Sequence, residues 1–265
     1  MFAIIPIDKP VGWTSFQVVN KLKWHIRHIT DIKKFKIGHA GTLDPLASGL
    51  LLVCVGKATK QIEQLQTGIK EYSGTMVLGA TTPCYDLERA IDAYYPYEHI
   101  TPVAVEEARQ RFLGEIEQVP PIFSAVKVDG KRAYLSARDG STAEIEPKKI
   151  TVYDFRIKNL RIPNNRNNQI TPNNQITPDT PIATHLYLNP QGSVPEGLPQ
   201  LDFHVTCSKG TYIRSLARDM GEALGSGAFL AALRRERIGD YSVDTAIQLE
   251  DIESVITHDI LNINC

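Results

Sequence analysis

The stretch GHAGTLDPLASGLLLVCVGKATK, residues 38–60, joins a glycine-punctuated loop to a short apolar run. Residues 36–48 are expected to form the loop, because glycine adopts backbone angles that bend the chain sharply. Residues 50–55 are continuously apolar and are followed by Gly56, a pattern typical of a buried strand. The stretch therefore predicts that Asp44 is presented on a tight loop just before a core strand.

Asp44 has two interpretations at this point. The flanking glycines let a ligand approach closely and Pro45 restricts the chain after the carboxylate, so Asp44 could act as a nucleophile or a base. Alternatively, Asp44 caps a short helix whose first residue is Pro45, an arrangement that needs no function. The spacing alone leaves both interpretations open.

Hydrophobic periodicity predicts mixed secondary structure on either side of this stretch. Helices are expected at residues 14–28, 106–113 and 211–224, and strands at residues 72–78, 151–157 and 201–207. The last helix carries Arg214 and Arg218 four residues apart on one flank, which places two guanidinium groups side by side. Taken singly, Arg214 could be a surface arginine and Tyr72 a core residue.

Length and composition describe a globular chain. It has 265 residues, 42% of them hydrophobic, with 29 Lys+Arg against 30 Asp+Glu. The longest apolar run is far shorter than the ~20 residues of a membrane span, and no signal peptide is expected. The four cysteines lie far apart without a CxxC pair, so neither a zinc site nor a disulfide framework is predicted, and a cytoplasmic location fits.

Two basic clusters stand out in this nearly neutral chain. Residues 17–40 contain six Lys or Arg and one acid, and residues 127–138 contain four Lys or Arg and one acid. Such clusters suit a polyanionic ligand on one face, although solvated helix surfaces show the same pattern.

Residues 162–200 differ in composition from the rest of the chain. Asn, Pro, Gln and Thr dominate there, and NNQITP occurs at 167–172 and again at 173–178. Such polar sequence buries too little apolar area to offset its ordering entropy, so a loose surface insertion is expected.

Six segments, in order along the chain, resemble bacterial tRNA pseudouridine synthases of the TruB family. They are IDKPVGWTS (7–15), the stretch at 38–60, KEYSGTMVLG (70–79), PPIFSAVKVDGKRAYLSARDG (120–140), CSKGTYIRSLARDMG (207–221) and ALRRERIG (232–239). The motifs that mark several other enzyme classes are absent from the sequence, namely the GxxxxGK phosphate loop, HExxH and GxSxG.

The resemblance implies a fold and an activity. The expected fold is mixed α/β, with a largely antiparallel central sheet flanked by helices and a catalytic cleft. The expected reaction converts uridine 55 in the T-loop of tRNA to pseudouridine on a flipped-out base, without metal or cofactor. Residues 1–240 would form the catalytic domain and residues 241–265 a short tail, too short for a complete PUA domain. The T stem-loop of tRNA is the expected partner, and the chain is expected to be a monomer that does not bind a membrane.

The resemblance also assigns roles to individual residues. Asp44 matches the family's catalytic nucleophile, Arg214 the arginine that pairs with it, and Tyr72 the tyrosine that stacks on the flipped base and is proposed to abstract a sugar proton. Four further residues match positions around the bound RNA: His39, Asp86, Tyr212 and Leu233. The segment TPCYDLERA, residues 82–90, departs from the family's usual glycine-rich ending, so the loop around Asp86 is expected to be unusual.

Two other functions remain possible on the residues alone. One is a non-catalytic RNA-binding or RNA-folding protein that uses the same cleft. The other is hydrolysis of a glycosidic bond by an Asp nucleophile, for which no second carboxylate can be identified as the general acid.

Overall fold

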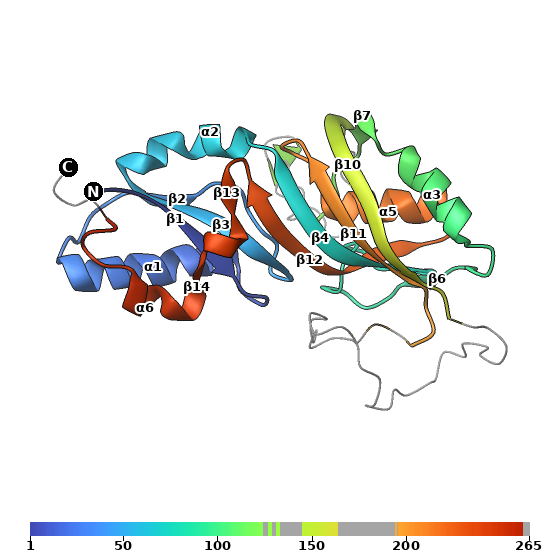
Figure 1. Cartoon of the computed structure of the whole chain (residues 1–265), viewed down its shortest axis with the longest axis horizontal. Coiled ribbons are helices and arrows are strands. Elements are labelled where there is room, and N and C mark those ends of the chain that lie inside the picture. Colours follow the sequence, from blue (N-terminus) through green and yellow to red (C-terminus); the bar gives the residue numbers. More distant parts are fainter. Residues whose placement is uncertain (124–126, 129–130, 133–144, 164–193, 195, 262–265) are drawn as a thin grey trace. The chain divides into compact units, whose positions relative to one another are not determined.

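The computed structural model of the chain describes residues 1–123, 127–128, 131–132, 145–163, 194 and 196–261 (Figure 1). Contacts divide the chain into two compact units. Unit 1 comprises residues 1–73 and 233–265, and unit 2 comprises residues 74–232. Strands β4 (Lys70–Leu78) and β12 (Ala228–Ile238) contribute residues to both.

The strands of unit 1 are arranged around β3 (Ala47–Gly56). Strand β1 (Phe2–Lys9) runs antiparallel to β3 along its whole length, from Phe2 opposite Gly56 to Lys9 opposite Gly49. On the other edge of β3, β12 runs parallel with Leu233 opposite Ala47, and β2 (Ile37–His39) runs antiparallel. The strand predicted at residues 50–55 is confirmed and is longer at its N-terminal end, and the predicted loop at 36–48 contains the short strand β2.

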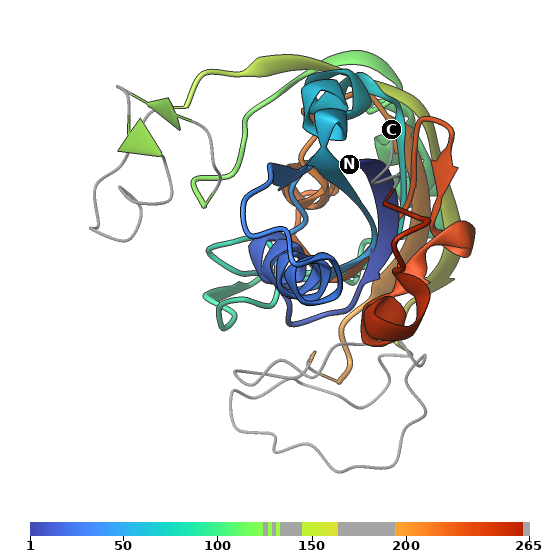
Figure 2. The same cartoon turned by 90° about the vertical axis from the view of Figure 1, so that its left-hand side faces the viewer.

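Helix α1 (Ser15–Thr30) begins where the sequence predicts. The Thr14 hydroxyl accepts a hydrogen bond from the Gln17 N–H at 3.1 Å, and the Gln17 side chain accepts one from the Thr14 N–H at 2.7 Å. This reciprocal pair is a capping box, which satisfies two backbone donors that the first turn leaves unpaired. The helix ends at Thr30, and the next residue, Asp31, has a φ of 55° that turns the chain away. Figure 2 shows α1 end-on.

Alternation along β3 sends its side chains into two apolar cores. On one face, Leu51, Val53 and Val55 pack with α1 and with buried residues of the C-terminal segment, namely Leu249, Ile252, Ile256 and Leu261. On the other face, Leu50 and Leu52 pack with Ile238 and Val243, and Leu65 of α2 (Ile62–Thr67) lies against them. Val243, Leu249, Ile252, Ile256 and Leu261 therefore belong to the cores of unit 1.

Unit 2 contains the strand order β4, β11 (Gln200–Cys207), β10 (Lys148–Arg161) and β7 (Gly114–Gln118). Strand β10 is antiparallel to both of its neighbours. Phe155 of β10 and Phe203 of β11 meet edge to face with ring centroids 6.1 Å apart. Helices α3 (Pro102–Gln110) and α5 (Ile213–Ala223) contact each other, and α3 also contacts β10 (Figure 1).

The predicted strands at 72–78, 151–157 and 201–207 correspond to β4, β10 and β11, and the helix predicted at 211–224 corresponds to α5. The helix predicted at 106–113 starts earlier, because Thr101 caps it and Pro102 occupies its first turn. The short elements are β5 (Ala80–Thr81), β6 (Ala93–Tyr94), β8 (Lys127–Val128), β9 (Lys131–Arg132), β13 (Tyr241–Ser242), β14 (Ile247–Gln248), η1 (Lys57–Gln61), η2 (Val243–Thr245), η3 (Leu249–Asp251) and α6 (Ile252–Val255).

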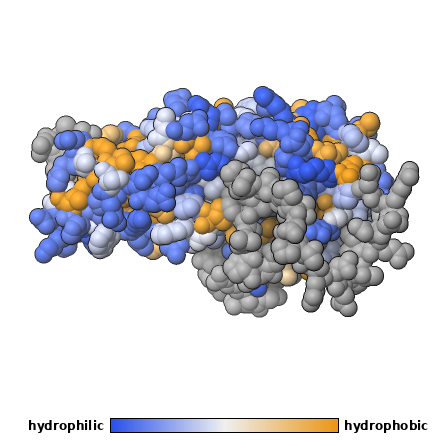
Figure 3. Space-filling model, turned by 60° about the horizontal axis from the view of Figure 1, so that its bottom comes forward, coloured by the Kyte–Doolittle hydropathy of each residue, from blue (hydrophilic) through white to orange (hydrophobic). Residues whose placement is uncertain are grey.

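These elements confirm the expected fold class, mixed α/β with mostly antiparallel strands. On the face drawn in Figure 3, apolar residues form separate groups within a largely hydrophilic surface. In the described part of the chain, no helix has the length and hydropathy needed to cross a membrane. Most of the predicted insertion and the side chains of the basic cluster at 127–138 lie outside the described residues.

Candidate active site

Asp44 lies in a tight turn that leads directly into β3. The N–H of Ala47 donates a hydrogen bond to the carbonyl of Asp44 at 3.1 Å, with Pro45 at the second position of the turn. Strand β3 begins at Ala47, so no helix follows Asp44. The helix-cap interpretation of Asp44 is therefore wrong, and its half-buried carboxylate is presented on a turn, as the other interpretation requires.

A buried arginine holds the chain just before Asp44. The guanidinium of Arg235 donates to three carbonyls: Leu50 at 2.8 Å, Gly41 at 3.1 Å and Thr42 at 3.3 Å. Its planar fork can serve several acceptors in fixed directions, which an ammonium group cannot. Arg235 thus ties the loop at 41–42 to the strand that follows it.

Two further side chains hold the loop at Asp44 itself. The Ser15 hydroxyl donates to the carbonyl of Leu43 at 3.1 Å and accepts from the N–H of Leu43 at 2.9 Å. The Lys9 ammonium donates to the carbonyl of Pro45 at 3.3 Å. The residues immediately before and after Asp44 are therefore both anchored by buried polar groups, which restricts where the carboxylate can lie.

Lys9 also contributes to the electrostatics of this turn in unit 1. Its side chain is completely buried, and its ammonium donates to the carbonyls of Pro10 at 2.9 Å and Trp13 at 2.6 Å. Burial lowers the pKa of Lys9 from 10.5 to about 8, although the negative charge of Asp44 acts in the opposite direction. Near neutral pH, Lys9 is therefore mostly charged and attracts the Asp44 carboxylate.

Gly49 allows the strands behind the turn to approach closely. It lies opposite Lys9 of β1 and opposite Arg235 of β12. Its φ is 98°, and a Cβ built there would come within 2.3 Å of the Arg235 carbonyl oxygen. Because only glycine fits, Gly49 keeps both anchoring residues beside the loop that carries Asp44.

Two more of the expected site residues, Leu233 and Tyr72, belong to unit 1. Leu233 pairs with Ala47 at the start of β3, directly after the turn that carries Asp44. Tyr72 is buried on β4, whose residues Glu71 and Ser73 contact Arg237 and Glu236 of β12. A buried Tyr72 agrees both with a core role and with a wall of a base-binding site.

His39 is half-buried on β2, where it pairs with Val53 of β3. Its Nδ1 atom is buried and has no hydrogen-bond partner among the described residues. Burial lowers the pKa of His39, with the backbone of Gly41 opposing this effect. His39 is therefore neutral at physiological pH and suited to packing against an uncharged group.

The expected site residues of unit 2 gather around Arg214. Its Nε atom lies 3.7 Å from a carboxylate oxygen of Asp86, and both side chains are less than a tenth exposed. Its two Nη atoms donate to the carbonyls of Cys84 at 3.2 Å and Phe123 at 3.0 Å. Arg214 is therefore a buried, positioned cation, and the surface-arginine interpretation is wrong.

Tyr212 is held at the N-terminus of α5 by a buried glutamine. The N–H of Tyr212 donates to the Gln118 side-chain oxygen at 2.8 Å, and the Gln118 amide donates back to the carbonyl of Tyr212 at 3.1 Å. The Gln118 side-chain amide thus pairs with the backbone N–H and carbonyl of Tyr212, as a neighbouring peptide group would. The Tyr212 side chain itself makes no capping hydrogen bond. It fixes the start of the helix that carries Arg214.

Sequence reasoning did not single out Lys9, Ser15, Arg235 or Gln118. The first three lie in the segments IDKPVGWTS and ALRRERIG, so the signal present was their place in segments that resemble the TruB family. What the sequence does not show is that their side chains turn inward onto backbone groups of one distant loop.

Comparison with known proteins identifies the family. Residues 27–176 match the family described as "TruB family pseudouridylate synthase (N terminal domain)", and residues 214–260 match "tRNA pseudouridylate synthase B C-terminal domain". The chain belongs to the TruB family. Its members are pseudouridine synthases, a class of isomerases, and this confirms the resemblance stated from the sequence.

Individual relatives agree with this assignment. A protein named tRNA pseudouridine synthase B from Flavobacterium johnsoniae is 49% identical over 93% of this chain and 92% of its own length. The protein of the same name from Parabacteroides distasonis is 42% identical over 98% of this chain and 95% of its own. Among solved structures, a chain from a Cbf5-Nop10-Gar1 complex superposes with a TM-score of 0.59 at 28% identity, covering 96% of this chain and 54% of that one. This chain thus spans about half the length of that structure.

Proposed function

We propose that this chain is a cytoplasmic tRNA pseudouridine synthase that converts uridine 55 in the T-loop to pseudouridine. Membership of the TruB family supports the reaction class, and the names of the relatives support tRNA as the substrate. Position 55 as the site of modification is proposed from the resemblance of the six segments to the TruB family.

The reaction is an internal rearrangement. The bond from C1′ of the ribose to N1 of uracil breaks, the uracil turns while it remains bound, and a bond forms from C1′ to C5. C5 then loses its proton and N1 gains one, so no atom is added overall and no redox cofactor is needed. Asp44 acts as the nucleophile toward the sugar, either in a direct adduct or around a glycal intermediate.

The anchored turn is the observation that carries this proposal. A nucleophile reacts faster when it is held in one position, because no free energy is then needed to orient it toward the sugar. In unit 1, Arg235 and Ser15 fix the backbone before Asp44 through hydrogen bonds of 2.9–3.3 Å, and Lys9 fixes the backbone after it through a hydrogen bond of 3.3 Å. These three buried side chains hold the loop so that the Asp44 carboxylate is presented from a fixed turn.

The remaining residues act on the base and the carboxylate. Arg214, already oriented by Asp86 and two carbonyls, is the proposed ion-pair partner of the Asp44 carboxylate. Tyr72 stacks on the flipped uracil, and its hydroxyl takes part in proton transfer from the sugar. Tyr212 and Leu233 line the same base site, and His39 contacts neighbouring T-loop bases. Stacking on an aromatic ring contributes about 1–3 kcal/mol per base, which helps offset the cost of base flipping.

Helix α1 offers a surface for the RNA backbone. Trp24 is exposed on this helix and stacks on His28 with ring centroids 5.6 Å apart. Arg27 and, after the helix, Lys33 and Lys34 are also exposed. A basic surface with an accessible aromatic pair suits a partner that has phosphates and unpaired bases.

Pseudouridine mapping of a tRNA transcript tests the proposal. The purified full chain is incubated with unmodified tRNA, and every uridine is then assayed for conversion. We expect conversion at position 55 and at no other uridine of the T-loop. Conversion at another position would disprove the assigned site while keeping the reaction class, and no conversion would disprove both.

A further inference from the structure

A network of polar side chains joins strands β14, β1, β12 and β4 within unit 1. Asp8 of β1 accepts two hydrogen bonds from the Arg234 guanidinium of β12, at 2.7 and 3.0 Å. Gln248 of β14 donates to the same carboxylate at 3.2 Å. The proposed reaction gives these three residues no role.

The network continues from β12 to β4. Glu236 lies two residues after Arg234 and on the same face of β12, and its carboxylate is 3.5 Å from the Arg234 Nε atom. The other carboxylate oxygen of Glu236 accepts a hydrogen bond from the Ser73 hydroxyl of β4. In the order of the sheet, the network thus joins the strands on one side of β3 to the strands on the other.

Three strands of the network also carry a residue of the candidate site. In each of them, the network residue and the site residue are neighbours in sequence: Asp8 and Lys9, Arg234 and Arg235, Ser73 and Tyr72. Successive side chains of a strand point to opposite faces of the sheet. The network therefore lies on the reverse face of the sheet, directly behind the residues that hold the turn at Asp44.

The ion pair between Asp8 and Arg234 crosses β3 close to Gly49. Gly49 lies opposite both anchoring residues of the turn, Lys9 and Arg235. Asp8 and Arg234 directly precede these two in sequence. The ion pair thus connects β1 and β12 at the position where the two anchors reach the loop from the other face.

The geometry of this pair favours a role in orientation. The Asp8 side chain is 11% exposed, and the planar guanidinium of Arg234 meets both of its carboxylate oxygens. Two parallel hydrogen bonds restrict distance and angle together. A pair of this kind adds little stability compared with apolar side chains of similar size, because both charges lose water. What it does provide is a fixed separation of the two strands.

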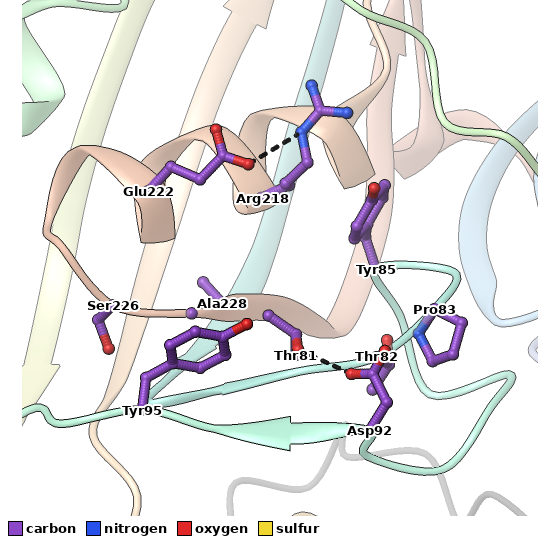
Figure 4. A pocket seen from close by; sticks show the side chains of 11 residues that line it. Thr81, Thr82, Pro83, Tyr85, Asp92, Tyr95, Arg218, Glu222, Ser226 and Ala228 are labelled. Carbon is purple, nitrogen blue, oxygen red and sulfur yellow. Dashed lines mark hydrogen bonds and ion pairs between the residues drawn. The ribbon is translucent and has the colours of Figure 1, made fainter. Parts of the chain in front are cut away.

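Another ion pair of the chain shows the difference. In the pocket of unit 2 drawn in Figure 4, the Arg218 Nε atom and a Glu222 carboxylate oxygen are 3.8 Å apart. Both residues belong to α5, and the Glu222 side chain is 70% exposed. Such a pair is screened by water and orients no second element. The pair of Asp8 and Arg234 is less exposed and joins two strands with β3 between them.

We propose that Asp8 and Arg234 are positioning residues for the reaction. Their ion pair fixes β1 relative to β12, and through Lys9 and Arg235 it holds the turn that presents the Asp44 carboxylate. A displacement of about 1 Å can slow a reaction about 100-fold, so a distant pair that prevents it contributes to the rate. The inference rests on the proposed function, because it concerns the rate of that reaction.

A double-mutant cycle tests the pair. Asp8→Asn and Arg234→Met each remove the ion pair, and the single-turnover rate of uridine conversion is measured at saturating enzyme. We expect each variant to slow conversion by about 10-fold or more, with tRNA affinity within about twofold of the wild type. The variant with both substitutions should be no slower than the slower single variant, because the two residues act as a unit.

Two control variants separate positioning from loss of stability. Val243→Ala removes apolar contacts from a core of the same unit, so it should lower the unfolding temperature but keep the wild-type rate. Asp202→Asn breaks a bidentate pair with Arg161 that joins β10 and β11 in unit 2, and it should also keep the rate. Thermal unfolding shows whether each variant is folded at the assay temperature.

A conservative variant covers the case in which Asp8→Asn or Arg234→Met does not fold. Arg234→Lys keeps a positive charge opposite Asp8 but lacks the planar fork. We expect it to slow conversion without weakening tRNA binding. A wild-type rate for Arg234→Lys would overturn the inference.

The remaining outcomes separate this inference from the proposed function. If folded Asp8→Asn and Arg234→Met convert uridine as fast as Val243→Ala, the pair stabilises the fold alone and the inference is wrong. Losses that multiply in the double variant, or weaker tRNA binding at an unchanged rate, would also overturn it. If the wild-type chain converts no uridine, the proposed function itself fails.

Discussion

The ammonium of Lys9 donates a hydrogen bond to the carbonyl of Pro45, the residue directly after Asp44, at 3.3 Å. Lys9 is completely buried, and its other two hydrogen bonds go to the carbonyls of Pro10 and Trp13. A single side chain thus joins the end of β1 to the turn that carries the proposed nucleophile. This hydrogen bond couples the stability of unit 1 to the ionisation of Lys9.

The sign of that coupling follows from the lowered pKa. Lys9 has a pKa of about 8 in the folded chain, against 10.5 for a lysine in water. Between these values the unfolded chain holds more protons, so the contribution of Lys9 to the unfolding free energy rises with pH, by up to about 3 kcal/mol. Below pH 8, Lys9 is charged in both the folded and the unfolded chain, so the full cost of burying its charge lowers the unfolding free energy.

Urea unfolding of the wild type and of Lys9→Met at pH 7.5, 9 and 10 measures this contribution. The unfolding free energy of the wild type minus that of Lys9→Met should increase as the pH rises. Lys57→Met, at an exposed lysine of the same unit, should show no such change. Parallel pH profiles for the wild type and Lys9→Met would show that Lys9 does not ionise as described.

Arg214→Lys should reduce pseudouridine formation by about 10-fold or more with tRNA binding little changed. The guanidinium serves two carbonyls and faces Asp86 at once, and an ammonium group cannot reproduce this planar arrangement. Single-turnover rates at saturating enzyme measure the effect. Arg156→Lys is the control, because Arg156 is exposed and pairs with Asp154 on β10. Equal rates for Arg214→Lys and the control would remove Arg214 from the mechanism.

Exposed lysines after α1 should contribute to the salt dependence of tRNA binding. Replacing Lys33 and Lys34 by Gln should reduce the slope of log K against log salt concentration by about 0.7–0.9 for each phosphate that is no longer neutralised. The control replaces Lys148 and Lys158, two exposed lysines of β10. Binding isotherms at four salt concentrations give both slopes. An unchanged slope for Lys33→Gln, Lys34→Gln would mean that these residues do not bind the RNA.

The predicted insertion should be dispensable for folding. Strands β10 and β11 pair up to Arg161 opposite Gln200, so the insertion joins two strands that are already hydrogen-bonded. Closing a long loop costs only about 0.6 kcal/mol per doubling of its length. Replacing residues 164–180 by a short Gly-Ser linker should keep cooperative unfolding and near-normal turnover. A loss of cooperativity, measured by thermal unfolding, would show that this segment belongs to the core.

Local signals in the sequence predict much of the fold. Thr14 and Gln17 mark the start of α1, and the apolar run that ends at Gly56 marks β3, because caps and burial patterns act over a few residues. Strand β1 is not among the predicted elements, since Pro6 interrupts its apolar pattern. Proline removes a backbone donor, and only the pairing with β3 shows that β1 accommodates it.

The candidate site could be predicted only in part. Asp44 and Arg214 are recognisable by their motifs, but the hydrogen bonds that hold them are not. Arg235 reaches Gly41 across 194 positions of sequence, and Gln118 reaches Tyr212 across 94. Such long-range hydrogen bonds depend on how the strands are ordered, and no local pattern encodes this.

Conversion of uridine 55 by Asp44→Asn is the most direct test of the proposed nucleophile. The amide keeps the size and shape of the side chain but cannot attack the sugar. With wild-type enzyme as reference and single-turnover conditions, we predict no detectable pseudouridine at position 55, with tRNA affinity within a few-fold of the wild type. Conversion by Asp44→Asn at the wild-type rate would contradict the assignment of Asp44 as the nucleophile.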